Sequence, residues 1–354
     1  MRFSSTMRAG GALLIATALL AGCSSSEEKS ESTSSATGTS TESADYGDLA
    51  IQLSWVADAE FGGEFMADDR GYFADAGFAS VSFLPGPSAT ESLVLSGQVD
   101  VGISTPAALA PVVVEEGAPL KIIATEYQAN PSAMMSLAES GINEPADLIG
   151  KTIGVQPGNT ELIVDGFLKA NGIDPSEVTK VPVTYDPMDL VNGGVDAMPG
   201  YITNEPLVLA DAGYDVSLMK YEDYGLPYIT KSYIATDESI ADRRDELKAF
   251  LTALVMGWND SVAEPDETVR LATDVYGVDL GLSTETEARL VGIQNAELVV
   301  SDETAQSGLL TISDAAIERS LASLALIGYD VTAEQIFDTS LINEVYADNP
   351  ELLN

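Results

Sequence analysis

Short apolar strands alternate with helical stretches along most of this chain, and the pattern runs twice. The first series of expected strands covers residues 49–53, 81–84, 99–103 and 120–125. Helical stretches are expected between these strands, at 61–70, 90–96 and 106–116. After Lys151 the pattern restarts, with strands at 152–155 and 178–183 around a helix at 161–171. Such alternation is typical of α/β sheets with helices on both faces. We therefore predict two α/β lobes.

A short sequence repeat supports two related lobes. Residues 96–100 read SGQVD and residues 192–196 read NGGVD, and a Leu-Val pair stands just before each, at 93–94 and 190–191. In both places a helix should end on glycine, a short strand should begin and a polar loop should follow. Six residues after each valine stand Thr105 and Tyr201. Chance similarity between two ordinary helix–strand joints is the alternative.

The lobe boundaries are expected from where the alternation breaks. Two extended segments, 132–138 and 228–235, are interpreted as crossings between lobes. Lobe 1 is then residues 46–131 plus 236–354, and lobe 2 is residues 139–227. The last part reads as helical, with an apolar helical stripe over 247–258 and helices near 265–276, 284–298 and 314–327 that should pack on lobe 1. Trp258 lies on the apolar stripe of the first of these helices, so we expect it in the core.

The loops that follow the strands are the candidate binding site, because ligands bind at the carboxyl ends of strands in such sheets. Trp55 directly follows a strand and can offer a stacking face, although a core position is the alternative. Gly62 and Gly63 would let a ligand approach the backbone at a helix start. The candidates in lobe 1 are Ser54, Trp55, Glu60, Gly62, Gly63, Ser88, Ser104, Thr105, Tyr127 and Gln128. The candidates in lobe 2 are Asn159, Thr160, Tyr185, Tyr201, Thr203, Asn204 and Glu205.

Several kinds of chemistry are excluded by residue types. The chain has no His and one Cys, so a Cys/His zinc site, a cysteine nucleophile and a histidine-based triad are not expected. No P-loop or dinucleotide-type glycine motif is present. The candidate loops hold aromatics and acids but no Lys or Arg, which are the usual partners of anions. We infer a flat ligand that is neutral or weakly cationic, with Glu60 or Glu205 accepting from an amine. An anion held by helix N-termini remains the alternative. We expect no metal and no cofactor.

The N-terminus has the pattern of an export signal. Arg2 and Arg8 precede an apolar run at 11–20 that is too short to span a bilayer. The sequence Leu-Ala-Gly-Cys then ends at Cys23, the only cysteine, and resembles a bacterial lipobox. We expect residues 1–22 to be removed and Cys23 to carry lipid, with a plain secretory signal as the alternative. Residues 23–45 are rich in Ser, Thr and Glu and should form a disordered tether.

The strong acidity of the chain limits its partners. The net charge is −40 over 354 residues. Nucleic acid is not expected as a partner, because no basic footprint is present. The acidity fits either a salt-rich habitat or an acidic exported proteome.

The first loop also carries a family resemblance. Ser54-Trp55, Gly63, the run 70–73 (Arg-Gly-Tyr-Phe) and Gly77-Phe78 resemble the start of solute-binding proteins of the alkanesulfonate and pyrimidine-precursor type. The segments 96–100 and 141–155 continue the resemblance, which extends from residue 49 to about residue 260. The pyrimidine binders of that family have Pro-Asn after the Trp and a His in this loop. Here Val56-Ala57-Asp58 stands after Trp55.

The resemblance implies a two-lobed periplasmic-binding-protein fold of type II, the venus-flytrap arrangement, with a mixed sheet flanked by helices in each lobe. It implies a monomeric receptor, anchored to the outer face of the cytoplasmic membrane, that delivers a small molecule to an ABC permease and its ATPase. Ligands of the family include thiamine-type pyrimidines, riboflavin, alkanesulfonates, taurine and nitrate. Fungal enzymes of the family depend on a His and a Cys-rich motif, so we predict no enzymatic activity. A secreted carboxylate-dependent enzyme and a surface adhesin remain the alternatives from other classes.

Overall fold

The computed structural model describes residues 44–156 and 159–353. The expected signal peptide at 1–22, Cys23 and all but the last two residues of the tether lie outside the described residues. Within the described part, no helix is both long and apolar enough to cross a membrane.

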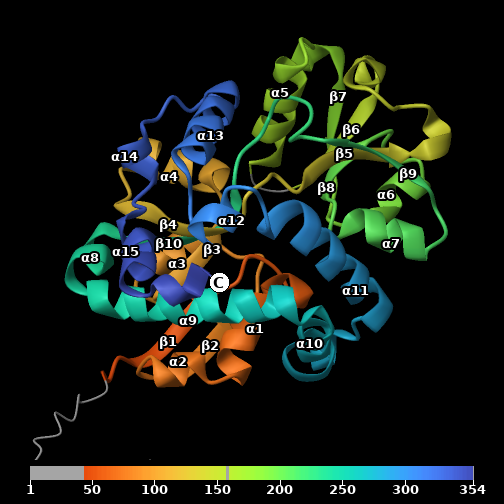
Figure 1. Ribbon diagram of the computed structural model, residues 1–354. Helices are drawn as coiled ribbons and strands as arrows, with labels where there is room; N and C mark the ends of the chain where they lie inside the picture. The colour runs from red at the N-terminus through yellow and green to blue at the C-terminus, as the bar shows by residue number, and fades with distance from the viewer. Residues whose placement is uncertain (1–43, 157–158, 354) are drawn as a thin grey trace, which may run out of the picture. The chain divides into compact units, whose positions relative to one another are not determined.

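A mixed five-stranded sheet forms the first lobe (Figure 1). Its strand order is β2-β1-β3-β10-β4. Strand β1 is parallel to β2 and β3, whereas β10 runs antiparallel between β3 and β4. The strands are β1 (Gly47–Gln52), β2 (Phe78–Leu84), β3 (Val101–Ser104), β4 (Leu120–Tyr127) and β10 (Thr230–Thr236). The first four confirm the strands expected from the sequence, and most apolar residues of β1, β3 and β4 are buried in the sheet.

The second lobe holds two smaller groups of strands. An antiparallel group has the order β8-β5-β9, and β6 pairs with β7 in parallel. An isolated bridge from Ile153 to Ala197 joins the two groups. The strands are β5 (Ser132–Leu137), β6 (Thr152–Val155), β7 (Thr179–Pro182), β8 (Met198–Tyr201) and β9 (Val216–Lys220). The mixed sheets in two lobes confirm the fold class.

Helices cover both lobes, and most of them follow the predicted pattern. Those before β10 are α1 (Gly62–Asp69), α2 (Tyr72–Asp75), α3 (Thr90–Leu95), α4 (Pro106–Glu116), α5 (Thr160–Ala170), α6 (Met188–Val191) and α7 (Glu205–Asp211). Those after it are α8 (Asp237–Asp242), α9 (Arg244–Ala263), α10 (Pro265–Leu271), α11 (Thr284–Ile293), α12 (Thr304–Ser307), α13 (Asp314–Leu326), α14 (Ala333–Ile336) and α15 (Ser340–Asp348).

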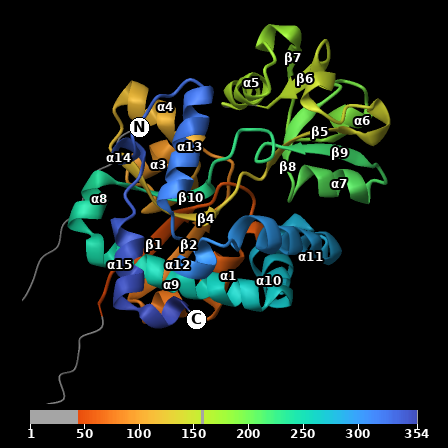
Figure 2. The same ribbon diagram turned by 45° about the horizontal axis from the view of Figure 1, so that its top comes forward.

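The C-terminal helices pack on lobe 1, and two of them also reach lobe 2. Helix α9 lies against α1 and α15, and Trp258 within it is fully buried, as expected. Helix α11 also contacts α7, and α13 also contacts α5. Figures 1 and 2 both show α11 close to lobe 2. The chain after β10 therefore contributes contacts to both lobes.

The two expected crossings are strands in the structure. Residues 132–138 contain β5, the middle strand of the three-stranded sheet, and residues 228–235 contain most of β10. The chain passes between the sheets at 128–131 and 221–229 instead. These links contact each other, because the Asn130 side-chain amide donates to the Leu226 carbonyl at 3.0 Å. An extended crossing and a buried strand have the same apolar pattern, which explains the displacement. Hinge motion at these links stays a prediction.

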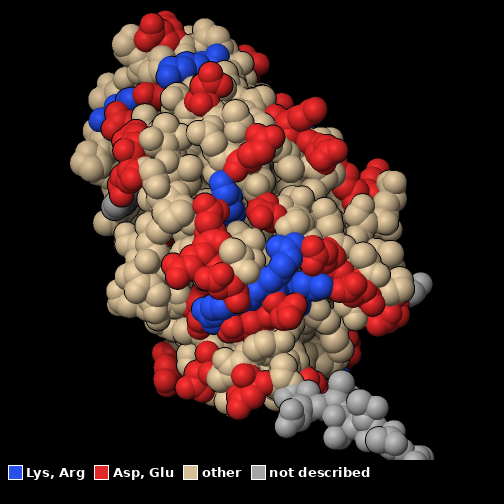
Figure 3. Space-filling model, turned by 90° about the vertical axis from the view of Figure 1, so that its left-hand side faces the viewer, with Lys and Arg blue, Asp and Glu red and all other residues tan. Residues whose placement is uncertain are grey.

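Charged side chains on the face of α8, α9 and α15 are extensively paired. In Figure 3 the Lys and Arg residues of this face form a group surrounded by Asp and Glu. Arg243 contacts Asp100 at 2.7 Å and Lys248 contacts Asp348 at 2.6 Å. Arg244 holds Glu344 of α15. These pairs tie α9 to its neighbours and leave the few cations of this face compensated.

Candidate functional site

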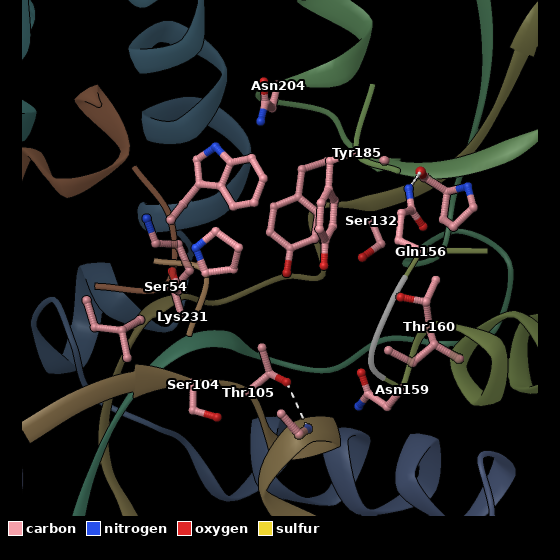
Figure 4. Close-up of a pocket in the computed structure, with 18 of the residues that line it drawn as sticks. Ser54, Ser104, Thr105, Ser132, Gln156, Asn159, Thr160, Tyr185, Asn204 and Lys231 are labelled. Atoms are coloured by element: carbon pink, nitrogen blue, oxygen red, sulfur yellow. Dashed lines mark hydrogen bonds between the residues drawn. The ribbon is translucent and has the colours of Figure 1, made fainter. Parts of the chain in front are cut away.

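A cavity of about 350 Å³ lies where residues of both lobes meet. Strand ends and helix starts supply its walls: Ser104 ends β3, Tyr201 ends β8, and Glu205 begins α7. In Figure 4, Asn204 and Tyr185 lie on one side of the cavity, and Ser104, Thr105 and Asn159 lie on the opposite side. The cavity thus lies at strand ends, where the sequence places the candidate binding residues.

The sequence repeat at 96–100 and 192–196 precedes two of the cavity residues, Thr105 and Tyr201. Gly97 and Gly193 both have left-handed backbones, with φ of 67° and 70°. Just beyond, Asp100 Oδ2 accepts from the Ala50 N–H at 2.9 Å, and Asp196 Oδ2 accepts from the Thr152 N–H at 2.8 Å. In each lobe the aspartate side chain thus accepts from the backbone of a neighbouring strand.

The consequence of this shared joint is that equivalent loops of the two lobes face one cavity. Thr105 and Tyr201, six residues after the matching valines, both line it. The repeat thus brings matching positions of the two lobes to one cavity, and a binding role for them stays a prediction.

Aromatic side chains make much of the cavity wall. They are Trp55, Tyr185, Tyr201, Tyr221 and Tyr228. The rings of Trp55 and Tyr185 come from different lobes and meet edge to face, with centroids 5.2 Å apart. The Tyr221 hydroxyl is buried and has no hydrogen-bond partner within the described residues. A buried hydroxyl without a partner costs roughly 1–3 kcal/mol, which a ligand group could recover.

Three carboxylates line the cavity. Glu60 accepts a hydrogen bond from the Thr203 hydroxyl of the other lobe at 2.6 Å, and Glu91 accepts from Ser104. Glu205 accepts from the Tyr201 N–H at 2.8 Å. Burial, with a smaller contribution from Glu60, raises the pKa of Glu205 to about 7, against the opposing effect of the backbone N–H groups. The cavity therefore presents acceptors from both lobes.

Lys231 also lines the cavity, so the expectation of a site free of Lys and Arg is wrong. The residue lies in strand β10, and the expectation considered only loops. Its Nζ donates to the Glu60 carbonyl at 3.0 Å and lies 3.5 Å from both Glu60 Oε2 and Glu126 Oε2. The ammonium also sits 3.8 Å from the centre of the Phe61 ring. Lys231 is 2% exposed, so carboxylates of the protein, rather than water, compensate its charge.

More carboxyl groups surround Lys231 behind the cavity wall. Burial, followed by the charge of Glu64, raises the pKa of Glu126 well above its ordinary value. Burial, followed by the charge of Glu60, also raises the pKa of Asp58. Burial raises the pKa of Glu64. Burial lowers the pKa of Lys231, but the carboxyl groups outweigh this effect and the net shift is upward. Lys231 is therefore the charged centre of a buried acidic cluster.

The structure brings together most of the predicted site residues. Twelve of them line the cavity: Ser54, Trp55, Glu60, Ser88, Ser104, Thr105, Asn159, Thr160, Tyr185, Tyr201, Asn204 and Glu205. Five do not: Gly62, Gly63, Tyr127, Gln128 and Thr203. Whether the twelve contact a ligand stays a prediction.

The five other residues have structural partners. The Tyr127 hydroxyl donates to Gln294 Oε1 at 2.5 Å, and the Gln128 amide donates to the Thr311 carbonyl at 3.2 Å. The Thr203 hydroxyl donates a hydrogen bond to Glu60 Oε1. Gly62 and Gly63 pack against α9, where a Cβ on Gly63 would lie 2.2 Å from the Trp258 ring. The glycine pair thus allows two helices to approach and does not open the backbone to a ligand.

Replacing Gly63 by alanine should lower the free energy of unfolding by about 2 kcal/mol, because the new methyl group overpacks the contact with Trp258. Ligand affinity of the folded fraction should not change. Urea denaturation measures the loss. Gly292→Ala on α11 is the matched control, since a Cβ there has nothing within 4 Å and alanine favours a helix. Equal stability of the two variants would contradict the packing role.

Several cavity residues were missed by the sequence reasoning. They are Glu91, Ser132, Gln156, Tyr221, Tyr228 and Lys231, together with smaller or apolar residues beside them. Gln156 directly follows strand β6, so the strand-end rule could have found it. Tyr221 and Tyr228 lie in the return link at 221–229, which the displaced crossing concealed. Within the described residues, no group of three or more His, Cys, Asp or Glu could hold a metal ion.

The family described as NMT1/THI5 like matches residues 58–268, which is more than half of the chain. The chain belongs to the NMT1/THI5-like family. This assignment confirms the resemblance seen in the first loop.

Relatives of this NMT1/THI5-like chain include proteins named for binding and proteins named for catalysis. The formylaminopyrimidine-binding protein of Halalkalibacterium halodurans is 28% identical over 258 residues, covering 70% of this chain and 74% of that protein. The 4-amino-5-hydroxymethyl-2-methylpyrimidine phosphate synthase of Schizosaccharomyces pombe is 27% identical over 223 residues, covering 58% and 63%. The periplasmic aliphatic sulphonate binding protein of Escherichia coli shares the fold, with a TM-score of 0.61, 14% identity, and coverage of 82% and 92%.

Proposed function

We propose that this protein is an extracytoplasmic receptor that captures a small, flat nitrogen heterocycle between its lobes and delivers it to an ABC importer. The observation that carries the proposal is the cavity of about 350 Å³ walled by aromatics and carboxylates from both lobes. That volume lies in the usual range for small-molecule sites. A thiamine pyrimidine precursor or a riboflavin-like compound fits this chemistry.

The aromatic wall favours a ligand with a flat face. Trp55 and Tyr185 meet across the two lobes, so a ring bound beside them would contact both lobes at once. Stacking on aromatic side chains stabilises a bound base by roughly 1–3 kcal/mol. The unpaired Tyr221 hydroxyl and the three carboxylates offer partners for ring nitrogens and amines. Binding of this kind would draw the lobes together.

An anionic ligand, such as an alkanesulfonate, taurine or nitrate, is the second candidate. The start of α4 reaches the cavity through Thr105 and Ala108, and the start of α5 reaches it at Thr160. Helix N-termini attract anions. Against it, Lys231 is the sole Lys or Arg among the described cavity residues, and its ammonium is taken up by Glu60 and Glu126. The heterocycle is therefore the better-supported ligand.

The same proposal includes the placement of the protein. Lipid on Cys23 would hold a monomeric receptor at the outer face of the cytoplasmic membrane, next to its permease and ATPase. Mass spectrometry of the membrane fraction tests it, because the mature chain should begin at a diacylated Cys23. Unlipidated protein recovered from the medium would favour the plain secretory signal.

A thermal-shift screen of the folded body tests the ligand class. The panel holds thiamine, its pyrimidine precursors, riboflavin, taurine, alkanesulfonates and nitrate. A ligand at one hundred times its Kd stabilises the folded form by about 2.7 kcal/mol, which such a screen detects. Stabilisation by the anions alone would overturn the proposal that the ligand is a heterocycle. Conversion of a bound compound during long incubation would favour a carboxylate-dependent enzyme.

Replacing Trp55 by alanine should weaken a heterocyclic ligand by about 1–3 kcal/mol, or roughly 5- to 150-fold in Kd, through lost stacking. Isothermal titration calorimetry measures the change. Trp258→Phe is the control, because this buried residue packs in the core of lobe 1 and should alter stability without altering Kd. An unchanged Kd in the Trp55 variant would place that residue outside the binding contacts.

A further inference from the structure

One end of the cavity combines two helix starts. Thr105 caps α4, since its hydroxyl accepts from the Ala108 N–H at 3.1 Å, and Ala108 itself lines the cavity. Asn159, at the start of α5, donates from its side-chain amide to the Ala107 carbonyl at 2.8 Å. In Figure 4, Ser104, Thr105 and Asn159 gather at this end. Two helix N-termini alone would make the end attractive to an anion.

Glu91 already places a carboxylate at this end. It is the second residue of α3 and lines the cavity, and the Ser104 hydroxyl donates a hydrogen bond to its Oε1 atom. The negative charge that helix N-termini would attract is thus supplied by the protein itself. An anionic ligand group that reached Ser104 would meet Glu91, and like charges in close contact cost several kcal/mol.

The other end of the cavity is acidic as well. Glu205 follows Asn204, which Figure 4 places on the side opposite Ser104. Glu60 is the third carboxylate of the wall, and it contacts Lys231 and Thr203. Lys231 compensates Glu60 but does not contact Glu91 or Glu205 within hydrogen-bonding distance. The cavity therefore carries net negative charge, with Glu91 at the end where α4 and α5 would otherwise favour an anion.

We propose that Glu91 is a specificity-determining residue that makes this end of the cavity accept a cationic or hydrogen-donating group and reject an anionic one. The inference rests on the proposed function and names the charge class of the ligand. Ser104 is the positioning residue, because its hydroxyl fixes the Glu91 carboxylate at the cavity wall. The ligand then carries an amine or another positively charged group at the end that faces α4 and α5.

A series of probes on one scaffold tests the proposal. The probes are 4-amino-2-methylpyrimidines that carry an aminomethyl, a hydroxymethyl or a phosphooxymethyl group at position 5, and thus a positive, neutral or negative substituent. Calorimetric Kd values are measured for the full chain. Wild-type protein should bind the amine most tightly and the phosphate ester least. In Glu91→Gln, the ratio of amine affinity to phosphate affinity should fall at least about tenfold.

Asp189→Asn is the matched control. Asp189 is the second residue of α6, the helix before the repeated joint in the other lobe, and it does not line the cavity. Both variants change the net charge of the protein by one, so the overall field changes equally. The affinity ratio should stay at the wild-type value in Asp189→Asn. A folding defect would affect all three probes alike and would leave the ratio unchanged.

The outcomes separate the two proposals. Binding of the scaffold with the same ratio in Glu91→Gln as in wild type overturns the role of Glu91 and leaves the heterocycle receptor standing. Wild-type protein that binds the phosphate ester as tightly as the amine also overturns it. Binding of none of the three probes overturns the pyrimidine ligand of the proposed function and the inference with it. If the ratio of amine affinity to phosphate affinity falls in Glu91→Gln and not in Asp189→Asn, both the receptor function and the role of Glu91 are supported.

Discussion

Replacing Lys231 by methionine should lower the free energy of unfolding by about 3–5 kcal/mol at pH 8. The substitution removes the ammonium that lies 3.5 Å from both Glu60 and Glu126. Glu64 and Asp58 are also buried in this cluster. The carboxyl groups would remain with no cation among them, and an uncompensated buried charge is strongly unfavourable.

The loss should be larger at pH 8 than at pH 5. Without the ammonium, the cluster binds protons more readily in the folded state, so the folded-state pKa values of its carboxyl groups rise further above the unfolded values. Groups with raised pKa values favour folding below the unfolded pKa, and this contribution is lost as pH rises through the folded pKa. Urea denaturation of wild type and Lys231→Met at both pH values measures the difference.

Two control variants separate the buried cluster from ordinary charge effects. Lys248→Met removes a partly exposed cation that contacts Glu344 and Asp348, and pairs of this kind contribute about 1 kcal/mol or less. Glu126→Gln removes one buried acid but keeps Lys231 beside Glu60, so it should destabilise the protein less than Lys231→Met does. If Lys231→Met were as stable as Lys248→Met, Lys231 would not be compensating the buried acids.

Much of the fold could be predicted because its signals are local. Apolar runs, glycine stops and the shared joint at 96–100 and 192–196 depend on neighbouring residues only. Ser104, Thr105 and Tyr201 were found because strand ends converge in an α/β sheet. These rules concern the backbone, so they place loops well and say little about which side chains enter the cavity.

The misplaced residues needed information that distant parts of the chain supply. Gly63 looks like a ligand-approach glycine until α9 brings Trp258 against it. Lys231 lies in a strand that reaches the sheet only after the chain returns from lobe 2. Its backbone is left-handed, with φ of 47°, which a lysine seldom adopts and which no local pattern indicated. The role of each residue follows from tertiary packing rather than from its neighbours in sequence.

Glu205 should make the stability of the ligand-free protein fall as pH rises from about 5 to 8. Burial raises its pKa to about 7 from an ordinary value of 4.5. A carboxyl with a raised folded-state pKa favours folding below the unfolded pKa, and that contribution is lost as pH rises through the folded pKa. The shift corresponds to a contribution of about 3 kcal/mol, lost between pH 4.5 and 7 and absent by pH 8.

Glu205→Gln should remove this part of the pH dependence, because the amide resembles the protonated carboxyl and its oxygen can still accept from the Tyr201 N–H. The variant should match wild type near pH 5 and exceed its free energy of unfolding by about 3 kcal/mol at pH 8. Other buried acids affect both proteins equally, so the difference between the two curves isolates Glu205. Glu303→Gln is the control, since hydrogen bonding to Ser313 and the nearby Arg319 lower the pKa of Glu303 despite partial burial, and its difference from wild type should stay constant over this range. Parallel curves for Glu205→Gln and wild type would mean that the cavity keeps this carboxylate ionised at pH 5, and a ligand amine would then find a permanent negative charge rather than a titrating one.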